Sequence, residues 1–258
     1  MNETLNHKDD QGRRSRAGDT GKERNALVIS AHAADFVWRA GGAIALYARQ
    51  GWHVHILCLS FGERGESARL WKQAGMTLQE VKRTRRDESR RAAGILGAKV
   101  SFLDCGDYPL RVGDDALFEI VALYRRLRPA FVLTHSTHDP YNFDHPLANR
   151  LALEARIIAQ AHGHDPATEA IGAPPVFLFE PHQPEQCGWK PELFLDISPV
   201  WETKRRAFET MAAQEHLWDY YTRVGLQRGV QASRNAGRKI QYAEAFECVY
   251  PRVADTLL

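Results

Sequence analysis

The feature that most constrains the fold is a repeated alternation of short apolar runs with longer amphipathic segments. Ala26–Ala31 is such a run, helical periodicity follows over Val37–Gln50, and the same order recurs along the chain. Strands and helices that alternate over short connections form right-handed βαβ units and a parallel sheet. Further strands are expected at Val54–Ser60, Val100–Leu103, Ala130–Thr134, Val176–Glu180 and Phe194–Ile197, and helices at Thr77–Leu96, Ala116–Leu127 and Pro146–Ala161. We therefore expect an α/β protein with a Rossmann-like, open, mainly parallel sheet and helices on both faces.

The two ends of the chain follow this pattern less closely. One long helix is expected from Trp201 to about Arg228, and a closing strand at Ile240–Tyr250. Residues 1–24 hold very few apolar side chains, so ordering them would bury little to offset the lost backbone entropy. The sequence thus predicts a disordered tail over 1–24 and a single domain over 25–258, a length that one large domain can accommodate.

Charge and cysteine usage exclude several classes of protein. The 34 Lys and Arg residues nearly balance 32 Asp and Glu, which argues against a dedicated nucleic-acid binder. A basic run at Lys82–Arg91 is expected to lie on a helix face turned to water or to a neighbouring subunit. No apolar run is long enough for a membrane helix. The 4 cysteines are widely spaced, which fits free thiols in a reducing compartment better than a disulfide framework. We expect a cytoplasmic enzyme, a homo-oligomer, with a small-molecule substrate and neither nucleic-acid nor membrane partners.

Unusual side chains follow several of the expected strands, at the sheet edge where open α/β folds bind ligands. No G-x-G-x-x-G turn follows the first strand, which argues against a dinucleotide. His32 and Asp35 bracket the turn that is there instead, and His145 ends a polar loop after the fourth strand. Two histidines and one carboxylate leave coordination positions open, as in catalytic zinc sites. The same set suits non-haem Fe²⁺, and on spacing alone His32 could equally be a helix cap.

The motifs around these residues resemble the PIG-L (LmbE-like) family of zinc-dependent amide deacetylases. The family carries A-H-P-D-D-E after its first strand and a later H-x-D-H loop, which match Ala31–Asp35 and Asn142–His145 here. The resemblance extends over nearly the whole chain after residue 25. It implies a Rossmann-like fold and a zinc ion held by His32, Asp35 and His145.

Two departures from the family pattern change the expected chemistry. The family's first Asp, the general base for amide hydrolysis, is replaced by Ala34, and a methyl group cannot accept a proton. The first His of the late motif, which supports the oxyanion, is replaced by Asn142. The metal ligands are kept while the hydrolytic groups are missing, so a different reaction of water is expected.

Four longer segments resemble a branch of this family that contains hydratases of aromatic-acid breakdown. They are Phe36–Gly42, Ser60–Ser67, Glu180–Cys187 and Gln214–Trp218. The resemblance implies metal-dependent, reversible addition of water to a carbon–carbon double bond of a tricarboxylate.

Hydration needs an acid and a base, and an anionic substrate needs polar partners. Glu66 and His182 are the expected acid–base couple, with their individual roles left open. Arg64, Tyr141 and Arg228 are the expected substrate-binding residues, because guanidinium and hydroxyl groups donate to carboxylates. Two alternatives are a zinc-dependent N-acetyl deacetylase whose base has moved to Asp144 or Glu66, and a binding protein with a degenerate pocket.

Overall fold

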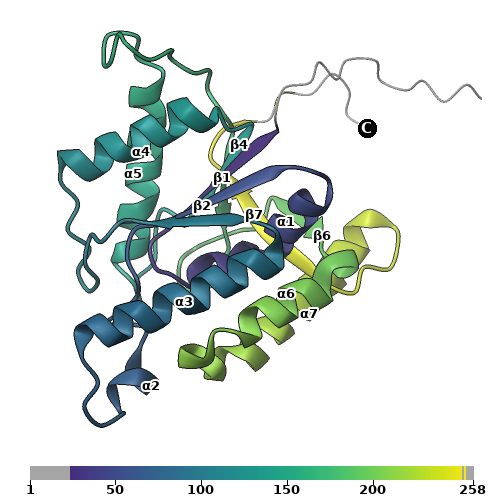
Figure 1. Cartoon of the computed structure of the whole chain (residues 1–258). Helices are drawn as coiled ribbons and strands as arrows, with labels where there is room; N and C mark the ends of the chain where they lie inside the picture. The colour runs from purple at the N-terminus through teal and green to yellow at the C-terminus, as the bar shows by residue number, and fades with distance from the viewer. Residues whose placement is uncertain (1–23, 252, 254–258) are drawn as a thin grey trace, which may run out of the picture.

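The computed structural model describes residues 24–251 and 253, and it contains a seven-stranded sheet with helices packed on both faces (Figure 1). The expected tail lies outside the described residues, apart from Arg24. The strands are β1 (Asn25–Ser30), β2 (His53–Cys58), β3 (Lys99–Phe102), β4 (Phe131–Thr134), β5 (Val176–Phe179), β6 (Leu193–Asp196) and β7 (Ala243–Cys248). Their order in the sheet is β3-β2-β1-β4-β5-β7-β6. The first five strands in this order, from β3 through β2, β1 and β4 to β5, pair in parallel. β7 pairs antiparallel with both β5 and β6.

The helices form two layers, one on each face of the sheet. They are α1 (Asp35–Arg49), α2 (Ala68–Trp71), α3 (Leu78–Leu96), α4 (Asp114–Leu127), α5 (Asp144–Ala159), α6 (Trp201–Glu209) and α7 (Trp218–Ala236), with 3-10 turns η1 (Ser198–Val200) and η2 (Ala212–Leu217). α4 and α5 cover one face, and α1, α3, α6 and α7 lie on the other side (Figure 1). The two apolar cores share β1, whose alternate residues Leu27 and Val28 belong to different cores. The expected α/β architecture is confirmed.

Local sequence signals explain the ends of α3. Thr77 caps the helix by accepting from the backbone N–H of Glu80, whose carboxylate accepts from the N–H of Thr77 in return. This reciprocal capping box satisfies N–H groups that the first turn leaves unpaired. Gly97 ends the helix in a left-handed conformation, at φ +78°, which glycine adopts without steric cost. Both boundaries were expected from the sequence.

The prediction of one helix from Trp201 to about Arg228 is wrong. α6 ends at Glu209, η2 follows at Ala212–Leu217, and α7 then continues to Ala236. Gln214 is non-helical, with φ −125° and ψ 35°. The N–H of Ala213 donates to Glu88 of α3, which replaces a hydrogen bond that a continuous helix would supply. The break is therefore stabilised by a side chain distant in sequence.

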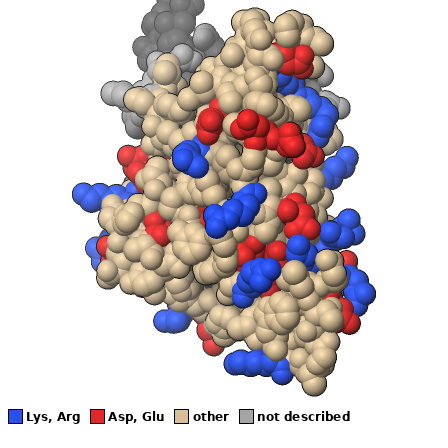
Figure 2. Space-filling model, turned by 90° about the vertical axis from the view of Figure 1, so that its left-hand side faces the viewer, with Lys and Arg blue, Asp and Glu red and all other residues tan. Residues whose placement is uncertain are grey.

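Two further expectations need correction. The final strand is shorter than Ile240–Tyr250, because the N–H groups of Gln241 and Tyr242 donate to the hydroxyl of Ser198 instead of extending the ladder. The basic run on α3 is not wholly solvated either. Arg85 is completely buried and donates to Glu88 and Gln214. Acidic and basic side chains are interspersed on the face shown in Figure 2.

Candidate metal centre and active site

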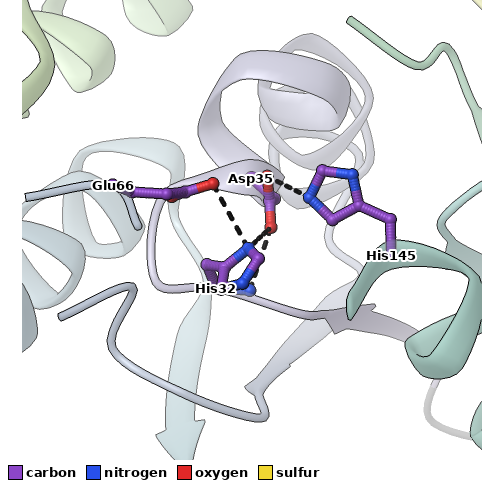
Figure 3. Close-up of side chains that lie close together, drawn as sticks. All are labelled: His32, Asp35, Glu66 and His145. Atoms are coloured by element: carbon purple, nitrogen blue, oxygen red, sulfur yellow. Dashed lines mark hydrogen bonds and ion pairs between the residues drawn. The ribbon is translucent and has the colours of Figure 1, made fainter. Parts of the chain in front are cut away.

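Four side chains from loops and from the first turns of helices converge where the strands of the parallel sheet end (Figure 3). His32 lies in the turn after β1, and Asp35 is the first residue of α1. Glu66 follows β2, and His145 lies in the first turn of α5, after β4. The carboxyl ends of parallel strands meet at one edge, which is why loops so distant in sequence come together here. The convergence expected for His32, Asp35 and His145 is present, and Glu66 joins them.

The distances within this cluster fit a single small cation. The ligand atoms of all four residues lie within 4.8 Å of one another. His32 Nδ1 is 3.1 Å from Asp35 Oδ2 and 3.2 Å from Glu66 Oε1. His145 Nε2 is 3.5 Å from Asp35 Oδ1, and this buried nitrogen forms no hydrogen bond with any described residue. A buried polar atom without a partner is costly, and a metal ion would remove that cost. The set of nitrogen and carboxylate donors fits a divalent metal such as zinc.

Carboxylates behind the two imidazoles fix which ring nitrogen faces the cluster. Nδ1 of His145 lies 2.8 Å from Asp139 Oδ2, so its proton is held there and Nε2 is left as the electron-pair donor. On His32 the order is reversed, because Nε2 lies 3.1 Å from Asp107 Oδ1 and 3.3 Å from Asp144 Oδ2. Such outer carboxylates orient histidine ligands and raise their basicity.

The cluster carries excess negative charge. Burial by itself lowers the pKa of His32, but the surrounding carboxylates, Glu66 first, raise it well above its usual value. Burial raises the pKa of Asp35, yet His145 and His135 overcome this and hold it well below its ordinary range. A group of buried carboxylates that stabilises positive charge this strongly is suited to a metal cation.

A cavity of about 190 Å³ opens beside the cluster. Its lining includes Asp35, Glu66 and His145, together with Trp38, Arg39, Asp139, Tyr141, Asn142, His182, Gln214, Leu217 and Tyr221. His182 stacks on Tyr220, with ring centroids 4.3 Å apart. Burial, and next the Arg39 cation, lower the pKa of His182, so the imidazole is neutral at neutral pH. The cavity therefore holds an uncharged histidine across from the carboxylate cluster.

Of the three expected substrate-binding residues, only one lines the cavity. Tyr141 lines the cavity, with its ring partly in solvent. Arg64 and Arg228 are absent from the lining, and Arg228 makes a two-armed ion pair with Glu180. Arg39 is instead the arginine that lines the cavity, donating to Glu180 O at 2.8 Å and contacting Asp35. Although burial lowers it, the pKa of Arg39 is raised by Tyr221 and Asp35, so Arg39 remains cationic.

The two departures from the family motif also have clear positions. Ala34 is completely buried at the N-terminal end of α1, and Asn142 lines the cavity. Asn142 Oδ1 accepts the N–H of Asp144. Asp144 accepts from the N–H groups of Tyr108 and Leu110 and does not line the cavity, so it is poorly placed to replace the missing base.

Sequence reasoning missed four residues of this site, namely Arg39, Asp107, Asp139 and Gln214. Asp107 follows β3, and that loop lies at the same sheet edge as the loops after β1, β2 and β4. Asp139 stands six positions before His145 in one polar loop, which is a usable signal for an outer carboxylate. The positions of Arg39 and Gln214 depend on packing between helices that are distant in sequence. In the sequence these two residues stood out only as members of the segments Phe36–Gly42 and Gln214–Trp218, which resemble the hydratase branch.

Comparison with known proteins agrees with this geometry. Residues 27–156 match the PIG-L family model, which is described as GlcNAc-PI de-N-acetylase. A 4-oxalmesaconate hydratase of Pseudomonas putida is 61% identical over 239 residues, covering 91% of this chain and 93% of the relative. A diacetylchitobiose deacetylase of Thermococcus kodakarensis is 30% identical over 77% of this chain and 73% of its own.

Solved structures give the same result. The crystal structure of the 4-carboxy-2-hydroxymuconate hydratase GalB from Pseudomonas putida superimposes with a TM-score of 0.90 at 61% identity, covering 91% of this chain and all of that one. An N,N'-diacetylchitobiose deacetylase from Pyrococcus horikoshii shares the fold, with a TM-score of 0.73 over 88% of this chain and 84% of its own, at 21% identity. With the His32, Asp35 and His145 cluster in place and these matches across most of its length, the chain belongs to the PIG-L family.

Proposed function

We propose that this protein is a metal-dependent hydratase that adds water to the double bond of 4-oxalmesaconate or its enol tautomer, 4-carboxy-2-hydroxymuconate. The product would be 4-carboxy-4-hydroxy-2-oxoadipate. The observation that carries the proposal is the cluster of potential metal ligands beside a buried Ala34, at a position where the family has the carboxylate for amide hydrolysis. The similarity to the Pseudomonas putida hydratase supports it.

His32, Asp35 and His145 are the residues that would hold the metal, and zinc is the ion we propose. Their donor set matches catalytic zinc sites of two histidines and one carboxylate. When bound, the ion would act as a Lewis acid that polarises an oxygen atom of the reactants. Fe²⁺ satisfies the same donor set, so metal analysis of the purified protein tests this choice.

We assign the removal of a proton from water to Glu66. Its Oε1 faces the metal cluster, 3.2 Å from His32 Nδ1, and the side chain also lines the cavity. A carboxylate in this position can accept a proton from a water molecule while the oxygen of that water adds to carbon.

We assign proton transfer at the substrate to His182. Because its lowered pKa leaves it neutral, His182 enters the reaction as an acceptor. The enol hydroxyl of the substrate can supply this proton, and the resulting imidazolium can then protonate one carbon of the chain, which converts the enol to the ketone. The proton that Glu66 took from water passes to the carbon beside the one that receives the hydroxyl group, so both side chains return to their starting states. Arg39 is the cation placed to bind a substrate carboxylate, in preference to Arg64 or Arg228. Tyr141 can donate a further hydrogen bond at the rim.

The test is a comparison of two reactions with one metal-loaded sample. We expect loss of the ultraviolet absorbance of the conjugated tricarboxylate and no acetate release from N,N'-diacetylchitobiose. Acetate release without hydration would contradict the proposal and favour the deacetylase alternative.

No described helix is long and apolar enough to cross a membrane. The cytoplasmic location and the homo-oligomeric state stay predictions.

A further inference from the structure

Gln214 lies where two hollows of the molecule meet. It lines the cavity beside the metal cluster and also an open cleft of about 750 Å³. Glu66 is the other residue common to both linings. The cleft carries Lys72 and also Arg69, which pairs with Glu215 of the same lining. A substrate that extends from the cavity into the cleft must therefore pass between Gln214 and Glu66.

A buried arginine fixes the orientation of the Gln214 amide. Arg85 Nη2 donates to Gln214 Oε1 at 2.7 Å. Arg85 is completely buried, and its other nitrogens donate to Glu88 Oε2 at 2.8 Å and to Phe61 O at 3.3 Å. A guanidinium group has donors only, so a flipped amide would place its NH₂ group against another donor. Oxygen must face Arg85.

The amide nitrogen is consequently left for a different partner. Gln214 Nε2 forms no hydrogen bond with any residue in the described part of the chain, although the side chain as a whole is nearly buried. The non-helical backbone of Gln214 places this side chain between α3 and the cavity. An amide N–H₂ that is oriented in advance and open to a cavity is a ready donor for an anionic ligand.

We propose that Gln214 is a substrate-binding residue whose Nε2 donates to a substrate carboxylate at the mouth of the cavity, with Arg85 as its positioning residue. This inference rests on the proposed hydratase function. A substrate with three carboxylates needs more donors than Arg39 and Tyr141 can provide. Gln214 supplies one without adding a cation that would compete for the metal's carboxylate ligands.

The competing explanation is that Gln214 serves only to satisfy Arg85, and two variants separate these roles. Gln214→Met removes both the acceptor for Arg85 and the donor for substrate. Gln214→Glu keeps an oxygen acceptor for Arg85 but replaces the donor with an oxygen. If Gln214 only supports Arg85, the Glu variant should behave as wild type. If it binds substrate, both variants should be impaired.

The experiment measures kcat and KM for hydration with the full-length, metal-loaded protein, and metal content in every sample. We expect KM to rise about 10- to 100-fold in both variants, the size expected for losing a hydrogen bond to a charged group. The change of kcat should be much smaller, because the lost contact serves binding before and during the reaction. Gln160→Met, at the end of α5 and remote from the cavity, is the matched control and should keep wild-type kinetics.

The outcomes separate this inference from the function on which it rests. An unchanged KM in Gln214→Glu, in a sample whose wild-type counterpart hydrates the substrate, would overturn the role of Gln214 alone. If Gln214→Met fails to fold because Arg85 loses its partner, the Glu variant still decides the question. A wild-type protein that does not hydrate the tricarboxylate would overturn both proposals.

Discussion

The two sides of the His32 ring are lined by similar residue types, but they differ in their hydrogen bonding and in their access to the cavity. On the Nδ1 side lie Asp35, Glu66 and His145, and on the Nε2 side lie Asp107 and Asp144. Either group has enough ligand atoms close together to hold a cation. Residue types and distances therefore do not distinguish the two sides.

The difference lies in how far the polar atoms are already satisfied. Asp107 Oδ2 accepts from the backbone N–H groups of Arg64 and Gly65, and Asp144 accepts from those of Tyr108 and Leu110. Asp107 Oδ1 forms no such hydrogen bond, but it lies 3.1 Å from His32 Nε2 and outside the cavity lining. On the other side, His145 Nε2 and Glu66 Oε2 are buried without hydrogen-bond partners, and the side chains face a cavity. Carboxylates that are held by backbone N–H groups and lie outside the cavity lining anchor the fold, whereas unpaired electron-pair donors beside a cavity are available to bind a metal and substrate.

The largest expected effect comes from removing a ligand on the Nδ1 side. His145→Ala should abolish stoichiometric metal binding and lower kcat/KM by more than about 10⁴-fold, because the reaction loses its electrophile. Metal analysis and steady-state kinetics provide the check. A variant that retained one metal ion per chain would show that the cluster is not the binding site.

Removing a proton-transfer group should have a smaller effect and leave the metal in place. His182→Ala and Glu66→Gln are each expected to lower kcat about 10²- to 10⁴-fold, as for other acid–base residues. Metal content should stay near wild type in both, since His182 lies outside the cluster and Gln keeps an oxygen at position 66. Near-normal turnover in Glu66→Gln would contradict its assignment as the base.

Substitutions of the outer carboxylates test whether each one acts through the histidine that it contacts, Asp107 through His32 and Asp139 through His145. Asp107→Asn and Asp139→Asn should weaken metal affinity about 10- to 100-fold, the usual cost of disturbing a partner of a histidine ligand. Competition with a chromophoric chelator measures this. If Asp107→Asn instead created a second bound metal or left affinity unchanged, the anchoring role of that side would be wrong.

The smallest expected effect is a dependence of kcat/KM on pH in the wild-type protein. Because the pKa of His182 is lowered from its usual value of 6.5, kcat/KM should fall only as pH drops below about 6.5, when the imidazole is protonated and can no longer accept. The pKa values of Asp107 and Asp144 are also lowered, so both carboxylates stay charged and the circular dichroism spectrum should not change over this range. Loss of structure in parallel with activity would contradict this separation.

Much of the scaffold could be predicted because its signals are local. The apolar run of β1 was located to within one residue, and Thr77 and Gly97 marked both ends of α3. Where partners lie far apart in sequence, prediction failed. The Trp201–Arg228 segment has helical periodicity, yet Glu88 of another helix breaks it near Ala213. Arg85 looked like one of several solvated cations until its buried partners were known.

The sequence by itself determined most of the order of strands and helices, the types of side chain that meet at the sheet edge and the presence of Ala34 where the family has a carboxylate, because each is encoded in neighbouring residues. Only the tertiary structure decided which atoms are satisfied and which face the cavity. It placed Arg39 in the cavity lining and Arg64 outside it, kept Asp144 out of that lining and left the amide nitrogen of Gln214 without a hydrogen-bond partner among the described residues. The physical reason is that hydrogen-bond satisfaction depends on distances between groups that can be more than a hundred residues apart, which no local pattern specifies.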